Sequence, residues 1–395
     1  MQRPPDHRPT IALCHPWLGL GGSEAAVMWG IEALRDDYDI TLVTASRVDL
    51  GKLNAAYGTS VAAGDFHLLR APALPAVRNP SRLAHWRVKR FEQFCRTNTG
   101  AFDIPLSAYN PIDFGRPGIH LVGDFSWDDS TRSELFGGGA GGQQIRRGYL
   151  WLGSRLFGTS GRDILNGHDL VVANSDWTSR TLAERFGLSG APVLYPPVHA
   201  SPQVTPTQRR KGSFVCLGRV SPEKGIERLI EILARVRDRG HEEVRLTIVG
   251  AIGDDEYGQR IAELVQANCA WVNTPGYVGS DEKFKLLGEH EFGIHACEGE
   301  AFGIAVAEML MSGCLPFVPA SGGAVEIVRD EALCYRDRDD AVEKICAALA
   351  EREDQAGQRG LLLEGAIRFA PKTFMEQLHT IVRRFHHRNQ GVRAA

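Results

Sequence analysis

The sequence predicts an α/β protein with two domains, each built on a doubly wound parallel sheet. Short apolar runs typical of buried parallel strands alternate with helical segments along most of the 395 residues, and the alternation restarts after a proline-rich connector. The connector reads Pro-Val-Leu-Tyr-Pro-Pro-Val from Pro192 and continues into polar residues, which is typical of an interdomain hinge. A chain of this length with 43% hydrophobic content can bury two cores.

The first half of the chain gives clear assignments near its start and again near residue 170. Continuous apolar runs predict strands there, because parallel strands are buried on both faces. The predicted strands are 10–14, 40–43 and 170–173, and helices are expected near 24–34 and 178–186. The span from 46 to 116 shows no clear pattern.

The second half is more regular, since each predicted strand is followed by a helix. The strands are 214–219, 244–249, 271–275, 292–296 and 314–318. A last helix, 374–388, carries apolar residues on one face, namely Phe374, Leu378, Ile381, Val382 and Phe385. The expected segments are a first domain (1–195), a hinge (196–211), a second domain (212–370) and a C-terminal helix that returns to the first domain (371–395).

Composition excludes several classes of function. The formal net charge of -3 provides no basic field, so nucleic acid is not an expected partner. No segment approaches the roughly 20 apolar residues of a membrane-spanning helix, and the polar start does not read as a signal peptide. The eight cysteines form no C-x-x-C pair, which fits free thiols in a reducing cytosol. They are Cys14, Cys95, Cys216, Cys269, Cys297, Cys314, Cys334 and Cys346.

The most informative motif is the run Glu-Gly-Glu-Ala-Phe-Gly-Ile-Ala-Val-Ala-Glu, from Glu298 to Glu308. It follows a predicted buried strand and enters a segment of helical composition that ends at Gly313. Glu300 therefore lies at the carboxyl edge of a strand, where ligands bind in open α/β sheets, and Glu308 lies two turns into the helix. One carboxylate can accept hydrogen bonds from hexose hydroxyls and the other from ribose hydroxyls. This pattern predicts a nucleotide-sugar site.

Two cations bracket the turn that follows the first strand of the second domain. Arg219 lies at the strand end and Lys224 near the start of a helix that runs to about Arg239. A guanidinium and a mobile ammonium can neutralise a leaving diphosphate, and a lysine in a first helical turn opposes the helix dipole unless an anion binds. The alternative is a pair of surface cations bound to Glu223 and Glu227.

A glycine-rich turn joins the first strand to its helix near the N-terminus. Gly21 and Gly22 allow backbone amides to approach a phosphate closely, and Ser23 is expected to cap the helix. Taken singly, such a turn is a weak signal, because many are only tight connections.

These motifs, in this order and over most of the chain, resemble glycosyltransferase family 4, whose members are retaining, nucleotide-sugar-dependent enzymes with the GT-B fold. The resemblance implies two Rossmann-like domains that face a central cleft, the first binding acceptor and the second donor. The hinge is most similar to that of mannosyltransferase-like members. The motifs are Gly21-Gly22-Ser23-Glu24, Val172-Ala173-Asn174-Ser175-Asp176-Trp177-Thr178 with Tyr195-Pro196-Pro197-Val198, Gly218-Arg219 with Glu223-Lys224-Gly225, Glu300-Ala301-Phe302-Gly303 through Glu308, and Ser321-Gly322-Gly323-Ala324-Val325-Glu326.

The resemblance also implies roles for single residues. Arg219 and Lys224 would hold the donor diphosphate, Glu300 the sugar hydroxyls and Glu308 the ribose, and Gly22 would face the diphosphate from the first domain. The loop 276–279 would lie against the nucleobase, which is guanine or uracil. The expected donor residues are Gly21, Gly22, Arg219, Lys224, Tyr277, Val278, Phe302, Gly303, Ile304 and Glu308.

The chain departs from the family near residue 120. Many family members carry a histidine after the fifth strand, beside the reacting carbon, and here the segment contains His120, Gly123 and Asp124. His120 alternates with apolar neighbours, so it is either catalytic or a satisfied buried histidine. Asp124 lies at the strand end and is expected to orient an acceptor hydroxyl or accept its proton. Its alternative role is capping or solvation beside Asp128 and Asp129. The expected catalytic residues are Glu300, Asp124, His120, Arg219 and Lys224.

Family membership implies retention at the anomeric carbon by front-face attack, with the leaving phosphate assisting deprotonation. Positioning and charge stabilisation then matter more than a protein base. No cofactor is expected beyond the GDP- or UDP-linked sugar donor. No metal is expected either, because the acidic pair Asp254-Asp255 reads as an exposed turn.

The acceptor is expected to be a sugar, a lipid-linked compound or a small molecule. Two basic, aromatic stretches suit an anionic lipid surface, which leaves peripheral contact with the inner face of the membrane as an alternative to a purely cytoplasmic location. An ordinary surface helix packed by Trp86 and Phe91 explains the first stretch better. The glycine-rich run 137–142 is either a lid or a plain loop. The stretches are Arg82, His85, Trp86, Arg87, Lys89, Arg90 and Phe91, and Arg146-Arg147-Gly148-Tyr149-Leu150-Trp151.

Two other functions fit the same motifs less well. A GT-B epimerase would use the nucleotide sugar without a second sugar, and a phosphorylase of this architecture would need a cofactor lysine and a longer chain. A non-catalytic binding subunit would keep the nucleotide site but lose the catalytic histidine. The presence of Arg219, Lys224, Glu300 and Glu308 favours the transferase.

Overall fold

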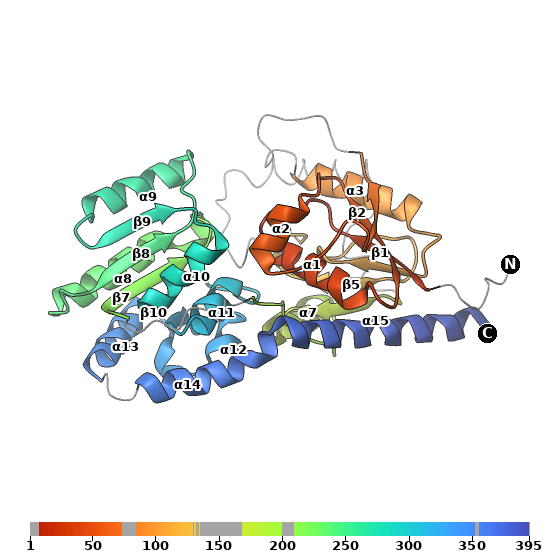
Figure 1. The fold of residues 1–395 in the computed structure, drawn as a ribbon. Coiled ribbons are helices and arrows are strands. Elements are labelled where there is room, and N and C mark those ends of the chain that lie inside the picture. Colours follow the sequence, from red (N-terminus) through yellow and green to blue (C-terminus); the bar gives the residue numbers. More distant parts are fainter. Residues whose placement is uncertain are drawn as a thin grey trace. The chain divides into compact units, whose positions relative to one another are not determined.

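The computed structural model describes residues 8–72, 84–128, 130–131, 134, 168–199, 209–351 and 355–394. The chain divides into two compact units, each described here by itself. Unit 1 comprises Met1–Pro197 with Pro371–Ala395, and unit 2 comprises Val198–Ala370. Each unit is built on a six-stranded parallel sheet flanked by helices (Figure 1).

The sheet of unit 1 has the strand order β3-β2-β1-β4-β5-β6. The chain moves outward from β1 to β3 and then returns to the other side of β1, which makes the sheet doubly wound with its switch point between β1 and β4. Its strands are β1 (Thr10–Cys14), β2 (Asp39–Thr44), β3 (His67–Arg70), β4 (Ile104–Ser107), β5 (Ile119–Val122) and β6 (Leu170–Ala173). Its helices include α1 (Gly22–Leu34), α2 (Leu50–Tyr57), α3 (Ala84–Asn98), α7 (Asp176–Phe186) and α15 (Pro371–Ala394).

Alternation along β1 builds the two faces of this sheet. Ile11 and Leu13 belong to the large core that includes residues of α1 and α15. Ala12 and Cys14 point to the other face and pack with Phe91 of α3. Successive side chains of a strand point to opposite faces, so one apolar run serves two helical layers.

Helix α15 packs along α1, and the two lie side by side in Figure 1. The approach is close, because a Cβ on Gly30 of α1 would lie 3.4 Å from Leu378 Cδ2. Four of the predicted apolar residues are buried and Ile381 is partly buried in the same core. The four are Phe374, Leu378, Val382 and Phe385. This C-terminal helix therefore contributes to the core of unit 1.

The sheet of unit 2 has the order β12-β11-β10-β7-β8-β9, again with all strands parallel. Its strands are β7 (Arg210–Leu217), β8 (Arg245–Val249), β9 (Val272–Gly276), β10 (His290–Ile294), β11 (Leu315–Pro319) and β12 (Cys334–Tyr335). Its helices include α8 (Ile226–Asp238), α9 (Glu256–Ala267), α10 (Ser280–Glu289), α11 (Ile304–Met311), α12 (Ala324–Val328), α13 (Arg338–Ala350) and α14 (Gln355–Ala366). Across its central strands, Phe214 stacks on Phe292 with ring centroids 4.9 Å apart, and Phe317 packs against Phe292 at a tilt with centroids 5.9 Å apart.

The predicted α/β class with two parallel sheets is confirmed, and all eight predicted strands are present. Strands β1 and β6 have the predicted ends, and the other six have shifted ends. The largest shift is in β7, which begins at Arg210 rather than at 214. The uninterpreted span contains α2, β3, α3 and β4. Strand β3 escaped prediction because it is an edge strand with mostly exposed residues, including Leu68 at 50% exposure.

Candidate functional site

The strongest candidate site lies in unit 2, at the carboxyl ends of the neighbouring strands β7 and β10. Beyond β7 the chain forms a short 3-10 turn, Pro222–Lys224, which places Lys224 ahead of α8 rather than in its first turn as expected. Lys224 Nζ donates a hydrogen bond to Glu300 Oε2. Both side chains are only 21% exposed. The structure therefore brings together a predicted phosphate ligand and a predicted sugar ligand.

Burial by itself opposes charge on both partners of this pair. Burial raises the pKa of Glu300, but the adjacent His295 and the Lys224 ammonium outweigh it and hold that pKa well below its usual range. Burial lowers the pKa of Lys224, but the negative charge of Glu300 outweighs it, so the pKa is raised. Both groups are charged at neutral pH, so a ligand that separates them must supply an anion to one and donors to the other.

Two further residues surround Glu300 that sequence reasoning missed. His295 Nε2 lies 3.4 Å from Glu300 Oε2, and the histidine is 3% exposed. Cys297 is also buried, and burial together with the charge of Glu300 raises the pKa of its thiol to about 12. The available signal was their position just after the apolar run of β10, at the same strand edge as Glu300.

A glycine pair holds the backbone at Glu300. Gly323 N donates to Glu300 O at 2.7 Å. A Cβ on Gly322 would lie 2.7 Å from Glu300 O, and a Cβ on Gly323 would lie 2.2 Å from Ala301 O. Gly322 also has a φ of 79°, which favours glycine. The predicted motif after β11 is therefore explained by backbone-to-backbone contact with the turn that carries Glu300.

Glu308 lies in α11, as predicted, and has a cationic partner that was not predicted. Lys283 Nζ donates to Glu308 Oε1 at 2.6 Å, and the side chains are 18% and 16% exposed. Lys283 lies on α10, which follows β9. This bond leaves Glu308 Oε2 for another donor such as a ribose hydroxyl.

Arg219 stands apart from the Lys224–Glu300 pair. Its side chain is 86% exposed, and Nη2 lies 3.8 Å from Glu223 Oε1. The surface-cation alternative therefore fits Arg219. It is wrong for Lys224, whose hydrogen-bond partner is Glu300, whereas Glu227 pairs with Arg260 at 2.9 Å. An exposed guanidinium with one long contact can turn toward an anion at little cost.

The predicted nucleobase loop follows β9. Gly276 has a φ of 77°, Tyr277 is 66% exposed and Val278 is buried. Tyr277 therefore offers a solvent-facing ring, whereas Val278 can contact a ligand only through its backbone.

The start of α11 presents backbone rather than side chains. Phe302 is buried and packs edge-on against Phe369, with centroids 5.2 Å apart, so its ring belongs to the core. Gly303 is the N-cap residue with a φ of 100°, and Ile304 begins the helix. The first amides of a helix have no intrahelical partner, so this turn can offer N–H groups to a phosphate.

In unit 1, the Glu24 carboxylate lies in the glycine turn at the start of α1 and accepts a hydrogen bond from Gly19 N. Gly21 is the N-cap residue and Gly22 begins the helix, with no side-chain cap. The expectation that Ser23 caps α1 is wrong, because Ser23 Oγ donates to Glu24 Oε2 at 3.0 Å and lies 3.0 Å from His15 Nε2. A Cβ on Gly21 would lie 2.7 Å from Glu24 Oε2, so glycine makes room for this carboxylate.

His120 is a buried histidine with both ring nitrogens engaged. Nε2 lies 3.0 Å from Asp169 Oδ1, Nδ1 accepts from Ile112 N at 3.4 Å, and the ring stacks on Phe114 at 5.3 Å. These contacts favour the structural alternative over the catalytic one.

Asp124 lies just beyond β5 and is exposed. Its Oδ1 accepts hydrogen bonds from Asn110 Nδ2 at 2.7 Å, Ser126 N at 2.9 Å and Ser126 Oγ at 2.6 Å. None of these bonds uses Oδ2. Asp124 is thus a fixed carboxylate with one oxygen available at the strand edge.

His15 lies at the same edge and was not predicted. It follows β1, is 0% exposed, and packs against Tyr109 with ring centroids 5.2 Å apart. Burial lowers its pKa from 6.5 to about 4, although the charge of Glu24 acts in the opposite direction. The folded state therefore holds a neutral imidazole over a range in which the unfolded chain binds a proton.

Because His15 is neutral in the folded state, the stability of the fold should decrease at acidic pH. The stability that depends on its neutrality is present above pH 6.5 and is lost as the pH falls toward 4. Between pH 7 and pH 5, the free energy of unfolding should fall by about 2 kcal/mol more in the wild type than in His15→Gln. Urea unfolding at both pH values measures the difference. The exposed His387→Gln variant should match the wild type, and an equal loss in His15→Gln would contradict the prediction.

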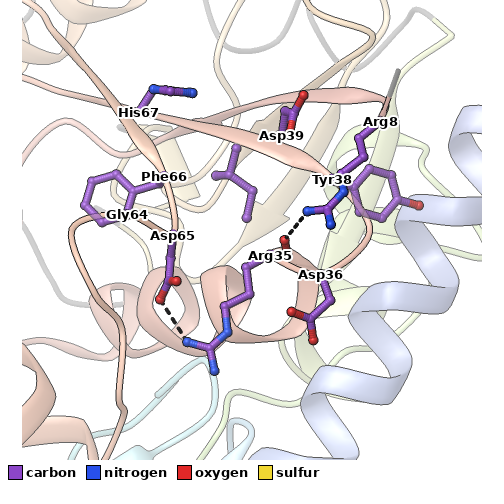
Figure 2. Close-up of a pocket in the computed structure, with 10 residues that line it drawn as sticks. Arg8, Arg35, Asp36, Tyr38, Asp39, Gly64, Asp65, Phe66 and His67 are labelled. Carbon is purple, nitrogen blue, oxygen red and sulfur yellow. Dashed lines mark hydrogen bonds and ion pairs between the residues drawn. The ribbon is translucent and has the colours of Figure 1, made fainter. Parts of the chain in front are cut away.

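The pocket in Figure 2 is a weaker candidate. It has a volume of about 560 Å³ and lies where β2 and β3 begin, at the opposite ends of these strands from the expected ligand edge. One of the two guanidinium groups that line it, that of Arg35, forms an ion pair with Asp65, with Nη1 2.8 Å from Oδ2 (Figure 2). The lining residues are Arg8, Arg35, Asp36, Tyr38, Asp39, Ile40, Gly64, Asp65, Phe66 and His67.

Some expectations concern residues outside the described ranges, namely Arg82, Asp129, the run 137–142, the stretch 146–151 and hinge residues 200–208. Within α3, Phe91 is buried and Lys89 pairs with Glu92 at 2.6 Å, both largely buried. This favours the ordinary packed helix for the first basic stretch.

Asp255 caps α9 by accepting a hydrogen bond from Gly258 N, as expected of a residue in an acidic turn. Among the described helices, none combines the length and apolar character needed to cross a membrane.

Comparison with known proteins bears on the fold and on the family of the second half of the chain. Sucrose-phosphate synthase from Thermosynechococcus elongatus superposes with a TM-score of 0.72 at 16% identity, over 96% of this chain and 99% of that one. Anabaena HepE, solved with UDP and glucose, gives 0.63 at 16% identity, over 94% and 99%. The chain has a GT-B fold. At these identities the likeness establishes the fold alone.

Within this GT-B fold, residues 199–359 match the family model described as glycosyl transferases group 1. The match covers the described strands and glycine turns of the candidate donor site. A Dictyostelium discoideum protein described as GDP-Man:Man(3)GlcNAc(2)-PP-Dol alpha-1,2-mannosyltransferase is 26% identical over 232 residues, or 53% of this chain. The match spans 46% of that relative's length.

Proposed function

We propose that this chain is a retaining hexosyltransferase of glycosyltransferase family 4. It moves a mannosyl- or glucosyl-like unit from a GDP- or UDP-linked sugar to a hydroxyl of a glycan, glycolipid or small-molecule acceptor. The observation that carries the proposal is the Lys224–Glu300 pair. It places an ammonium suited to phosphate and a carboxylate suited to sugar hydroxyls at one strand edge of a GT-B fold.

The donor occupies the carboxyl edge of the unit 2 sheet. Lys224 leaves Glu300 and binds the diphosphate together with the exposed Arg219, while Glu300 turns its oxygens to the hexose hydroxyls. The free oxygen of Glu308 accepts from the ribose, since Lys283 already occupies the other oxygen. The backbone at Gly303 and Ile304 faces the phosphates, and the loop with Tyr277 and Val278 faces the base.

The reaction is a substitution at the anomeric carbon. The acceptor oxygen attacks from the side on which the diphosphate leaves, the bond between the anomeric carbon and the phosphate oxygen breaks, and the hydroxyl proton passes to the departing phosphate. Lys224 and Arg219 stabilise the negative charge that develops on the diphosphate. In unit 1, Asp124 orients the acceptor through its available oxygen, and His120 has no part in the reaction.

Similar proteins support a nucleotide-sugar donor without selecting its base. The Dictyostelium relative is described as using GDP-Man, and the HepE structure holds UDP and glucose. Both bases therefore belong in the first binding test.

The proposal predicts opposite effects on two ligands in Glu300→Ala. Affinity for the free nucleoside diphosphate should be unchanged or higher, because Lys224 is released from its partner. The added affinity from the hexose should disappear, and product formation should fall about 100-fold, which is the scale for removing one oriented polar contact. Calorimetric titration with UDP, GDP, ADP, TDP and their hexose conjugates, with and without Mg²⁺, measures both affinities.

The matched control is Glu298→Ala, since Glu298 lies on the same turn and pairs with Arg228, but its side chain is 64% exposed. Its affinities should equal those of the wild type. Full product formation in Glu300→Ala would refute the donor assignment. Nucleotide binding without any transfer to sugar acceptors would favour the binding-subunit alternative, and inversion or epimerisation of the sugar nucleotide would favour an epimerase.

A further inference from the structure

Three potential metal ligands meet in the turn that follows β10. His295, Cys297 and Glu300 each offer one ligand atom, and these atoms lie within 4.8 Å of one another. Imidazole, thiolate and carboxylate are the ligand types that Zn²⁺ takes in proteins. The three residues lie within one short segment, so the turn held by Gly322 and Gly323 sets their spacing.

The imidazole of His295 makes no hydrogen bond through Nε2 within the part of the chain that the structure describes. His295 is 3% exposed, yet Nε2 has no hydrogen-bond partner among the described residues. It faces Glu300 Oε2 at 3.4 Å. A tetrahedral zinc ion with bonds of about 2.0–2.1 Å separates two such ligand atoms by about 3.4 Å. A buried nitrogen without a partner is costly, so a ligand that binds it gains free energy.

We propose that His295, Cys297 and Glu300 form an inhibitory site for a thiophilic divalent cation such as Zn²⁺. The ion is bound by His295 Nε2, Cys297 Sγ and one oxygen of Glu300, with water in the remaining position. Binding releases the thiol proton to solvent and displaces Lys224 from Glu300.

The inhibitory role rests on the proposed function, because the ion takes the carboxylate assigned to the hexose. It therefore competes with the donor and does not assist transfer. Mg²⁺ should bind poorly here, since it prefers octahedral oxygen ligands to imidazole and sulfur. Selectivity for Zn²⁺ or Co²⁺ over Mg²⁺ is part of the proposal.

The test is a titration of the full chain with Co²⁺ in the absence of donor. Cobalt should bind with one equivalent and produce a sulfur-to-cobalt charge-transfer band in the near ultraviolet together with tetrahedral visible bands. Cys297→Ser should abolish the charge-transfer band, and Cys297→Ala should weaken binding by more than about 100-fold. Cys269→Ser, at an exposed cysteine, should keep the full signal. Thermal unfolding of each variant confirms that it is folded.

The outcomes separate this proposal from the transferase assignment. Absence of the band in the wild type, or its persistence in Cys297→Ser, overturns the metal site whatever the activity. Displacement of cobalt by a bound UDP- or GDP-hexose supports competition. Cobalt binding in a chain that binds no nucleotide would keep the metal site and reject the proposed donor site. Simultaneous binding of cobalt and donor would reject the inhibitory role.

Discussion

Lys224→Ala should reduce kcat about 100- to 1,000-fold, the scale observed when one preorganised stabiliser of transition-state charge is removed. The Lys224 ammonium is partly buried at this strand edge and pairs with Glu300, whereas Arg219 is exposed and held by one long contact. In Lys224→Ala, affinity for the nucleoside diphosphate should fall together with kcat. Steady-state kinetics and calorimetry on the same preparation measure both effects.

Two variants make this result interpretable. Lys224→Arg keeps the positive charge and should recover part of the diphosphate affinity, although its planar head cannot reproduce the contact of an ammonium with Glu300. Arg235→Ala removes an exposed ion pair between Asp339 and helix α8, which follows Lys224, and should leave kcat unchanged. Wild-type kcat in Lys224→Ala would show that the leaving diphosphate is stabilised elsewhere.

Gly323→Ala should reduce transfer by at least about 100-fold without altering any ligand-binding side chain. The added Cβ would lie 2.2 Å from Ala301 O and 2.9 Å from Phe302 Cα, so the turn that carries Glu300 must move. Overpacking of this kind costs about 1–3 kcal/mol of stability. Displacing a catalytic group by about 1 Å costs about 100-fold in rate, and here Glu300 and the α11 amides move together.

The comparison variant for this change is Gly360→Ala. A Cβ at Gly360 meets no atom within 4 Å and lies in α14, where alanine favours the helix. It should raise the melting temperature slightly and leave activity unchanged. If Gly323→Ala binds nucleotide sugar as tightly as the wild type, the glycine contact does not position Glu300. Calorimetric titration and thermal unfolding of both variants decide the matter.

The sequence predicted those parts of the fold that depend on local pattern. Buried strands such as β1 and β6 read as apolar runs, and the apolar face of α15 was visible as a helical period. The exposed edge strand β3 carries no such signal, so its region stayed uninterpreted. Local pattern also failed to show that Lys224 precedes α8, because the turn at Gly225 depends on a positive φ.

The candidate site was predictable where a motif places one residue at a strand edge, and not where two distant segments meet. Glu300, Glu308 and Lys224 follow from position, but the bond between Lys224 and Glu300 joins residues 76 positions apart. The partner of Glu308, Lys283, comes from a third segment. The contact between His120 and Asp169 likewise depends on how two strands pack, so the sequence pattern did not predict it. Side-chain partners across a sheet are tertiary information that periodicity does not contain.

In the proposed donor site, the internal pairing of Lys224 with Glu300 should make ligand binding selective. A small free anion such as inorganic phosphate gains little by taking Lys224, because it leaves a desolvated carboxylate without its countercharge. A neutral sugar that takes Glu300 leaves the Lys224 ammonium without its countercharge. Only a molecule that carries phosphate and hydroxyl groups at the right separation satisfies both halves at once. In the proposed donor site, this ion pair should therefore disfavour inorganic phosphate and free sugars relative to a nucleotide sugar.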